Sequence, residues 1–280
     1  MKNDKRINRL AASSNTIMYD SENSEKYIDG APHVKHESLK KLYRNIIISS
    51  YKYSTKYYVM PRVLDIGSGN GSATLSFLEM GAKVTAIDIS KTQLEYLKEK
   101  CRKHDKRLEI KCGDVFDVID QISNSGNKYD IIIANSFLHH VPDFLSLIRN
   151  STKILSEYGQ FISFQDPLRY DTLNRVTVIL NKISYFSWRI FKGDVVNGIK
   201  RRIRRSRGNY LVNSVEDNME YHVIRNGVDH EAICVILERE GFVVEMLKYF
   251  STQSRFWQFV CEKLRIKNTF SIIARRDNRL

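Results

Sequence analysis

The sequence has little cysteine and proline and contains no long apolar run. Its 280 residues include four cysteines without C-x-x-C spacing, so we expect neither a disulfide framework nor a cysteine-type zinc site. No apolar stretch approaches the roughly 20 residues of a membrane-spanning helix. The first 20 residues begin with basic side chains but lack a continuous apolar segment, which makes them a poor signal peptide. These absences predict a cytoplasmic protein that does not span a membrane.

Acidic residues are too few to balance the basic ones. The chain has 45 Lys plus Arg against 32 Asp plus Glu, which gives a formal net charge of +13. Such an excess fits a nucleic-acid partner, an anionic membrane, an acidic substrate, or only a charged, solvated surface. Apolar residues make up 42% of the chain, which suffices for a sizeable core and excludes wholesale disorder.

Short apolar runs alternate with helical patterns through most of the chain. The alternation predicts an α/β fold with a doubly wound, mostly parallel seven-stranded sheet. Residues 1–30 are polar and predict a mobile arm with short helical turns, and residues 37–50 predict an amphipathic helix. The expected strands are 63–66, 83–87, 108–111, 129–134, 159–164, 242–248 and 270–274, and the expected helices between them are 72–80, 91–103, 115–122, 142–155 and 230–240.

This rhythm is interrupted over residues 167–228, which contain no clear strand. Apolar residues recur at helical spacing between 173 and 190, and six basic residues follow within 200–207. We interpret 167–228 as a helical insertion between the fifth strand and its crossover helix. Its basic cluster could recognise an anionic acceptor, anionic lipid or nucleic-acid phosphates, or could be a solvated helix face.

The glycine-rich segment after the first expected strand is the most informative part of the sequence. In VLDIGSGNG, residues 63–71, a strand leads through Gly67, Ser68 and Gly69 into a helix, so backbone N–H groups can approach a ligand. Asp88, at the end of the second strand, can accept hydrogen bonds from the hydroxyls of a ribose. Asp65 precedes the loop, and its carboxylate disfavours a pyrophosphate but suits the cationic end of S-adenosylmethionine. The third glycine also comes one residue too early for a dinucleotide fingerprint, which disfavours a nicotinamide dehydrogenase.

This segment resembles motif I of the class I S-adenosylmethionine-dependent methyltransferases, which have a Rossmann-like fold. Asp88 matches the ribose-binding acidic residue of that family, and we count the adjacent Ile89 among the cofactor contacts. In residues 112–115 the resemblance implies that Asp114 faces the adenine amino group and that Val115 packs on the ring. In residues 130–143 it implies that Asn135 sits on the sulfonium side.

The resemblance covers roughly residues 61–165 and, more loosely, 229–275. It implies S-adenosylmethionine as the cofactor and methyl transfer by in-line displacement. We therefore expect residues 1–60 to form an arm and helix that cover the cofactor site, and 61–280 to form the methyltransferase domain. The insertion at 167–228 is expected to cap the acceptor.

Two adjacent histidines follow the fourth strand, where ligands of α/β sheets bind. His139 and His140 are candidates for a general base, because histidine exchanges protons near neutral pH, and we prefer His140. His222 and His230 are second-line candidates. No glutamate or cysteine stands at ligand spacing from the pair, so no metal is expected.

Aromatic side chains of the N-terminal arm are candidates for covering the cofactor. Tyr19 and Tyr27 could lie over a sulfonium as a cation–π contact, or be ordinary surface tyrosines.

The acceptor is the least determined part of the prediction. Residues 135–138 read Asn-Ser-Phe-Leu and lack the Pro-Pro of DNA amino-methyltransferases, and no RNA-binding module is recognisable, so nucleic acid is less favoured. We predict methylation of oxygen or nitrogen on a small or medium-sized acceptor, such as a metabolite, a glycan or a lipid-linked precursor. The alternatives are an RNA methyltransferase that uses 200–207 and a non-catalytic cofactor-binding subunit. Residues 171–207 could also make peripheral contact with a membrane.

Overall fold

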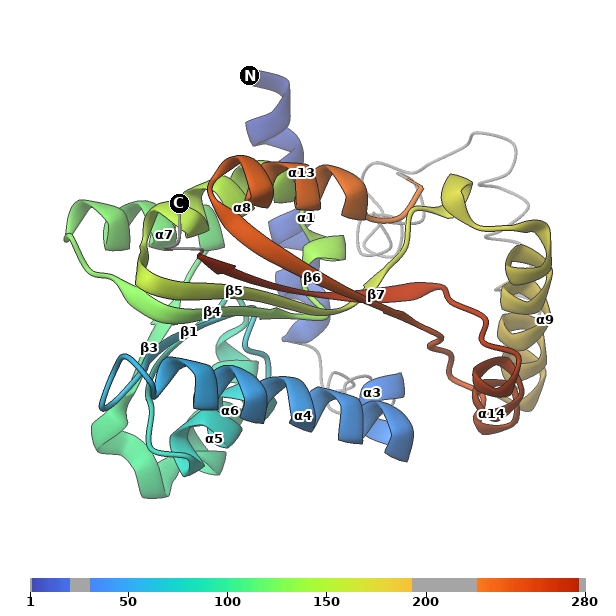
Figure 1. The fold of residues 1–280 in the computed structure, drawn as a ribbon, viewed down its shortest axis with the longest axis horizontal. Coiled ribbons are helices and arrows are strands. Elements are labelled where there is room, and N and C mark those ends of the chain that lie inside the picture. The colour runs from blue at the N-terminus through green and yellow to red at the C-terminus, as the bar shows by residue number, and fades with distance from the viewer. Residues whose placement is uncertain (1, 21–30, 193–225, 277–280) are drawn as a thin grey trace.

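A twisted seven-stranded sheet forms the centre of the molecule (Figure 1). The computed structural model describes residues 2–20, 31–192 and 226–276. The strand order is β3-β2-β1-β4-β5-β7-β6, and β7 is antiparallel to both of its neighbours while the other pairs are parallel. The predicted doubly wound, mostly parallel α/β sheet is thereby confirmed. The strands are β1 (Arg62–Ile66), β2 (Lys83–Asp88), β3 (Leu108–Cys112), β4 (Tyr129–Asn135), β5 (Leu155–Pro167), β6 (Phe242–Tyr249) and β7 (Thr269–Arg276).

Helices cover both faces of the sheet because the central strands are apolar on both sides. In β4, Ile131 and Ile133 belong to one core, whereas Ile132 and Ala134 belong to the other. The first face is covered by α4 (Glu37–Ser54), α5 (Ser72–Glu79) and α6 (Lys91–Lys100), with a 3-10 helix η1 (Arg102–Arg107) after α6. The second face is covered by α7 (Val115–Asn124), α8 (Phe144–Lys153) and α13 (His230–Arg239).

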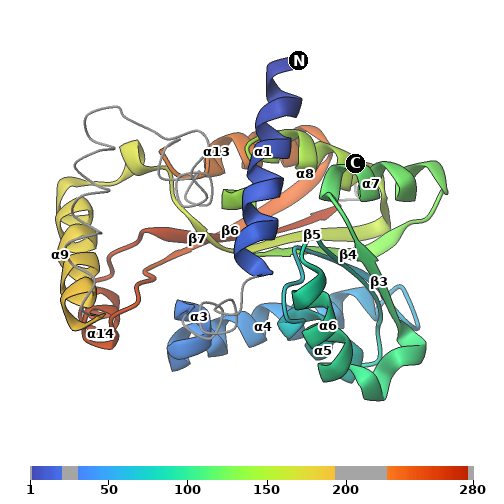
Figure 2. The same cartoon turned by 180° about the vertical axis from the view of Figure 1, so that it is seen from behind.

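The N-terminal segment differs from the mobile arm with short turns that the sequence predicts. Helix α1 (Lys2–Tyr19) is continuous over 18 residues, and Figure 2 shows it crossing the molecule near the ends of the central strands. Ala11 and Ser14 are buried, and the Asn8 side-chain oxygen accepts a hydrogen bond of 3.2 Å from the Asp143 N–H. Because a polar helix of this length is marginal alone, tertiary docking stabilises it. The short helix α3 (Pro32–Lys35) precedes α4.

The chain departs from the alternating pattern after β5. A 3-10 turn η3 (Tyr170–Thr172) leads into α9 (Arg175–Lys192), which confirms the helix predicted near the start of the insertion. Helix α14 (Arg255–Lys263), which the sequence pattern did not predict, lies between β6 and β7 and next to α9 at one end of the molecule (Figures 1 and 2). The basic cluster 200–207 lies outside the described residues. In the part of the chain that is described, no helix has both the length and the apolarity to traverse a bilayer.

Candidate functional site

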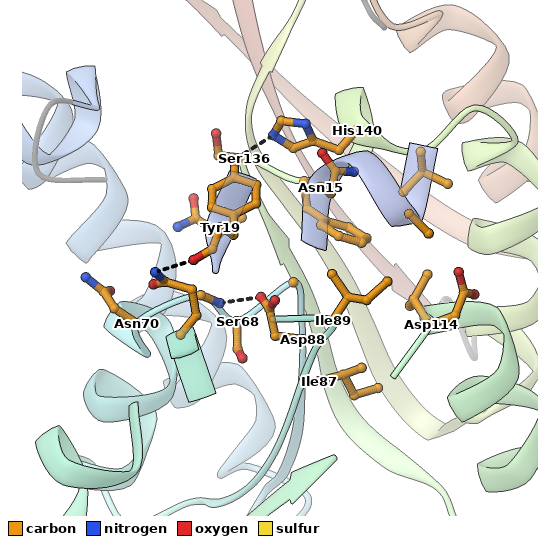
Figure 3. Close-up of a pocket in the computed structure, with 18 of the residues that line it drawn as sticks. Asn15, Tyr19, Ser68, Asn70, Ile87, Asp88, Ile89, Asp114, Ser136 and His140 are labelled. Atoms are coloured by element: carbon orange, nitrogen blue, oxygen red, sulfur yellow. Dashed lines mark hydrogen bonds between the residues drawn. The ribbon is translucent and has the colours of Figure 1, made fainter. Parts of the chain in front are cut away.

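A pocket lies beneath α1, beyond the carboxyl ends of β1, β2 and β4 (Figure 3). Its lining comes from α1 and α3, from the loop after β1, from the end of β2, and from the loops after β3 and β4. The strand order reverses between β1 and β4, because the chain runs outward from β1 on one side and from β4 on the other. Open α/β sheets bind their ligands at such a switch point.

The glycine loop after β1 forms one wall of this pocket. Gly67 and Gly69 have φ values of +66° and +50°, which lie in the left-handed region that favours glycine. A Cβ atom on Gly67 would lie 2.1 Å from the ring of Phe137, so only glycine fits there without a shift of that ring. The Gly69 N–H donates a 2.8 Å hydrogen bond to Oδ2 of Asp88, and Ser68 lies between the two glycines in the pocket lining.

Asp88 is the last residue of β2. Its side chain lies between the glycine loop after β1 and the start of α6. Its Oδ2 accepts from Gly69, and its Oδ1 accepts a 2.9 Å hydrogen bond from the Ser90 N–H. Burial raises the pKa of Asp88, while these N–H donors act in the opposite direction. Three backbone N–H groups contact this carboxylate, which leaves one of its four lone pairs for a ligand hydroxyl. Ile89 follows Asp88 and also lines the pocket.

The loop after β3 contributes Asp114 and Val115 to the pocket lining. Asp114 is the N-cap of α7, and its side chain accepts a 2.9 Å hydrogen bond from the Phe116 N–H. Burial raises the pKa of Asp114, and Val115 is itself buried. The structure therefore places an acidic group and an apolar group side by side at the predicted position.

Several buried polar atoms of the pocket have no hydrogen-bond partner among the described residues. Such atoms are rare in folded proteins unless a ligand or water satisfies them. They face a common cavity, which is the arrangement expected of a site for a polar ligand. They are Oδ1 of Asn15, Nδ1 of His33, Oγ of Ser68 and Oδ1 of Asn135.

Asp65 does not belong to the described lining of the pocket, although the sequence predicts it as a cofactor contact. Its side chain is 1% exposed, and its Oδ2 accepts a 2.6 Å hydrogen bond from the Thr74 hydroxyl at the start of α5. Burial raises the pKa of Asp65 to about 6. Asp65 could contribute to cofactor binding only indirectly, by supporting the glycine loop. Its predicted role as a cofactor contact therefore stays a prediction.

The raised pKa of Asp65 predicts a stability effect. Because the folded protein favours the protonated form of Asp65, ionisation of this carboxyl lowers the free energy of unfolding progressively as the pH rises from about 4 to about 6. Above about pH 6 the loss is complete. We expect Asp65→Asn to stabilise the protein by up to about 3 kcal/mol at neutral pH. That gain should vanish below about pH 4. Denaturant unfolding across this range measures it.

A control variant separates this effect from general surface charge. Asp120 is exposed on α7, so Asp120→Asn should leave stability unchanged. A less stable Asp65→Asn variant at neutral pH would show that the ionised carboxylate stabilises the loop, contrary to the expectation.

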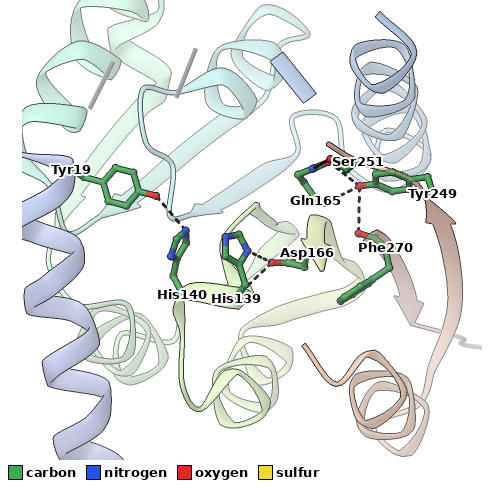
Figure 4. A network of polar contacts seen from close by, with 8 residues as sticks. All are labelled: Tyr19, His139, His140, Gln165, Asp166, Tyr249, Ser251 and Phe270. Atoms are coloured by element: carbon green, nitrogen blue, oxygen red, sulfur yellow. Dashed lines mark hydrogen bonds and ion pairs between the residues drawn. The ribbon is translucent and has the colours of Figure 1, made fainter. Parts of the chain in front are cut away.

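The two adjacent histidines lie on η2 (Leu138–His140), and their rings are 4.0 Å apart between centroids (Figure 4). His140 is buried and lines the pocket, and its Nε2 lies 3.3 Å from the hydroxyl of Tyr19. His139 is not among the residues that line the pocket. Its Nδ1 lies 2.8 Å from Oδ1 of Asp166. An ionised carboxylate can only accept, so His139 then carries its proton on Nδ1.

Asp166 is a functional candidate that sequence reasoning missed. It is fully buried, and it also accepts a 3.1 Å hydrogen bond from the His139 N–H. A β-bulge places it there: Gln165 has φ of +68°, and the partner residues on β7 advance by only one between Phe164 and Asp166. Asp166 therefore faces the side opposite to Phe164. Strict alternation along the strand would have placed the two side chains on one face.

His33 of α3 lines the pocket and is a functional candidate that the sequence did not predict. Its ring contacts Phe164 edge-on, with centroids 6.0 Å apart. Burial, with a smaller contribution from His139, lowers the pKa of His33 to about 4, so this imidazole is neutral at physiological pH. No local pattern around His33 marks it, because its place in the pocket depends on the packing of α3 against β5.

The remaining sequence candidates fall into three groups. Tyr19 lines the pocket, whereas Tyr27 and His222 lie outside the described residues. His230 is buried at the start of α13 with its Nε2 3.1 Å from Nζ of Lys248, and it does not line the pocket. None of residues 167–192 and 226–228 lines the pocket either, so the predicted acceptor cap stays a prediction. Residues 2–20, 31–192 and 226–276 contain no cluster of three potential metal ligands.

Residues 60–177 match a family model described as a methyltransferase domain. They include β1 to β5 and therefore most of the pocket loops. This match covers less than half of the chain, and it shows that residues 60–177 are similar to a methyltransferase domain. The ubiquinone biosynthesis O-methyltransferase of Coxiella burnetii is 27% identical over 113 residues, which are 40% of this chain and 44% of that relative. The chain thus spans less than half the length of this curated relative.

Solved methyltransferase structures share the fold of nearly the whole chain. The magnesium protoporphyrin IX methyltransferase of Synechocystis, solved with bound S-adenosylmethionine, aligns with a TM-score of 0.52 at 15% identity. That alignment covers 95% of this chain and 97% of that structure. The plantazolicin methyltransferase BamL, solved with a substrate analogue and S-adenosylhomocysteine, aligns with a TM-score of 0.56 at 13% identity, with 98% of both chains covered. At these identities the likeness establishes the methyltransferase fold.

Proposed function

We propose that this chain transfers the methyl group of S-adenosylmethionine to an oxygen or nitrogen atom of a small or medium-sized acceptor. The observation that carries the proposal is the convergence of polar groups on one pocket at the switch point of the sheet. Asp88 and Asp114 lie there beside the left-handed glycine loop. The buried oxygens of Ser68 and Asn135 have no partner among the described residues, so they fit a polar ligand.

Each wall of the pocket suits one part of this cofactor. Asp88 would accept a hydrogen bond from the ribose hydroxyls, because its carboxylate retains a lone pair beyond its backbone donors. Asp114 would face the adenine amino group, and Val115 would pack on the ring. Gly67 and Gly69 let the backbone approach the cofactor closely. Asn135 would lie on the sulfonium side.

When bound, S-adenosylmethionine supplies an electrophilic methyl group with a good leaving group. The task left to the protein is to orient the acceptor, exclude water and accept a proton. Helix α1 covers the pocket with residues such as Asn15 and Tyr19, and it thereby shields the site from solvent. His140 lies in the same lining and is our candidate for the general base. His139 supports it by ring packing and is itself oriented by Asp166.

Three features support a small acceptor. The pocket lies under α1, so a molecule must be small enough to enter there, whereas a nucleic acid needs an open and basic surface. The curated relative is named for ubiquinone biosynthesis, and the two solved neighbours are named for magnesium protoporphyrin IX and plantazolicin. The proposal also includes a cytoplasmic location with peripheral membrane contact through 171–207. Methylation of RNA through the 200–207 cluster is the alternative acceptor class.

Transfer of radiolabel from S-adenosylmethionine to fractionated cell extract tests this proposal. We expect label in the small-molecule or lipid fraction, with no transfer by Asp88→Ala under the same conditions. Label that enters RNA would replace the small acceptor by a nucleic acid. Tight binding of the cofactor without transfer to any fraction would favour a non-catalytic subunit.

A further inference from the structure

Helix α9 presents small polar residues to the body of the molecule. Thr177 and Ser184 are 3% and 2% exposed. The Ser184 hydroxyl lies 2.8 Å from that of Thr252, and the Asn181 oxygen accepts a 2.9 Å hydrogen bond from Asn268. A helix that packs through polar residues in this way directs its other face outward.

The outward face of α9 is apolar. Its exposed side chains recur at intervals of three and four residues, which places them in one row along the helix. Each is 42 to 56% exposed, although an apolar row at this spacing normally faces a core. We call this row the α9 stripe, and it consists of Val176, Ile179, Ile183, Phe186 and Ile190.

Basic residues run along one side of the α9 stripe. Positions 175 and 182 are Arg and Lys, they are seven residues apart, and each directly precedes a stripe residue. Helix geometry therefore places these positions in a second row beside the stripe. Arg175 and Lys182 are exposed, and the 18 residues of α9 include no acidic residue.

This charge pattern decides between the partners that an apolar helix face could take. A second copy of the chain would bring like charges together beside the α9 stripe, which costs free energy. An anionic bilayer attracts the basic row and buries the apolar row, as amphipathic interfacial helices do. The neighbouring α14 supports the same choice, because Phe256 and Phe259 are 66% and 61% exposed. Phenylalanine is common on the apolar face of helices that lie in the interface between lipid and water.

We propose that the α9 stripe docks this protein on the surface of an anionic phospholipid bilayer. The apolar row enters the boundary between headgroups and acyl chains, while Arg175 and Lys182 contact lipid phosphates. The helix lies in the plane of the surface and does not span the membrane. This inference rests on the peripheral membrane contact included in the proposed function and specifies its surface and lipid class. It does not depend on methyl transfer, since no residue of the stripe lines the cofactor pocket.

Co-sedimentation of the full chain with vesicles tests the docking surface. We expect binding to phosphatidylcholine vesicles that contain phosphatidylglycerol, and much weaker binding to phosphatidylcholine alone. Ile179→Gln with Ile183→Gln should weaken the partition about tenfold or more, because two exposed apolar side chains no longer enter the interface. Lys182→Gln should weaken it about fivefold, and only for the anionic vesicles.

The matched control changes exposed apolar residues elsewhere. Val235 and Val243 are 44% and 54% exposed on α13 and β6, and Val235→Gln with Val243→Gln should bind vesicles like the wild type. Calorimetry with S-adenosylmethionine should give the same affinity for all these variants, which separates this test from that of the cofactor site. Absence of wild-type binding to the anionic vesicles would overturn the proposal, as would equal binding by the stripe variant. If the wild type dimerised or bound RNA, and only the stripe variant lost this property, the stripe would be assigned to that partner instead.

Discussion

Replacing Asp88 by alanine is expected to raise the dissociation constant for S-adenosylmethionine about a hundredfold or more. The variant would lose the carboxylate that we place against the ribose hydroxyls, and each charge-assisted hydrogen bond contributes about 1.5–3 kcal/mol. It would also free the Gly69 N–H, whose 2.8 Å bond to Asp88 holds the glycine loop in place. Isothermal titration calorimetry measures the change directly and needs no knowledge of the acceptor.

Two further measurements separate the loss of binding from a loss of structure. Asp114→Asn preserves a side chain that caps α7 well, so it should weaken binding no more than about tenfold. Thermal unfolding without cofactor should show that Asp88→Ala remains folded. Unchanged affinity in Asp88→Ala would remove the ribose site from this pocket, and an equal loss in both variants would mean that the two acidic groups act together.

The cofactor side of the site could be predicted from sequence because its determinants are local. A strand, a glycine turn and a helix lie within 62–79, and Asp88 ends the next strand. Parallel strands bring their carboxyl ends to one edge, so the order of the motifs was enough to assemble them. The pocket lining contains Gly67, Ser68, Gly69 and Asp88, and their roles toward the cofactor stay predictions. Asp65 is the exception, because sequence shows that it precedes the loop but not that its side chain is directed to Thr74.

The other side of the pocket depends on packing between distant segments. Gln165 adds one residue to β5 and turns Asp166 toward His139, and no pattern in the sequence marks that bulge. His33 enters the pocket only because α3 packs near β5. The prediction of a mobile arm over residues 1–30 is wrong for α1. It was based on the small number of apolar residues in this segment. Its helix is stabilised by buried small residues such as Ala11 and by polar bonds to the domain.

The insertion shows the opposite case, in which the sequence predicts the element but not its orientation. Helical spacing correctly predicted α9, and its apolar row would normally be assigned to the core. The structure instead buries Thr177 and Ser184 and exposes Ile179. Polar partners on the segments around α14 decide this orientation, and those partners lie about seventy to ninety residues farther along the chain.

Replacing His140 by alanine is expected to lower the rate of methyl transfer by about 10²–10⁴-fold, without a comparable change in cofactor affinity. His140 lies in the same pocket lining as Asn135 and the glycine loop, which makes it our candidate for the group that takes the proton of an acceptor. Its Nε2 is 3.3 Å from the Tyr19 hydroxyl, which identifies a polar atom that an acceptor hydroxyl could replace. The assay is label transfer into the extract fraction that accepts methyl groups from the wild type.

The neighbouring residues supply the controls for this assignment. Tyr19→Phe removes only the hydroxyl, so it should reduce the rate less than His140→Ala does. His139→Ala leaves the buried Asp166 without its side-chain partner and should destabilise the fold by about 1–3 kcal/mol, which Asp166→Asn in the same chain should partly restore. Added imidazole should recover part of the rate of His140→Ala if the lost group accepts a proton, whereas a purely structural histidine would give no recovery. Full activity in a chain that carries both His139→Ala and His140→Ala would show that neither histidine is the base, and that orientation and desolvation alone sustain the transfer.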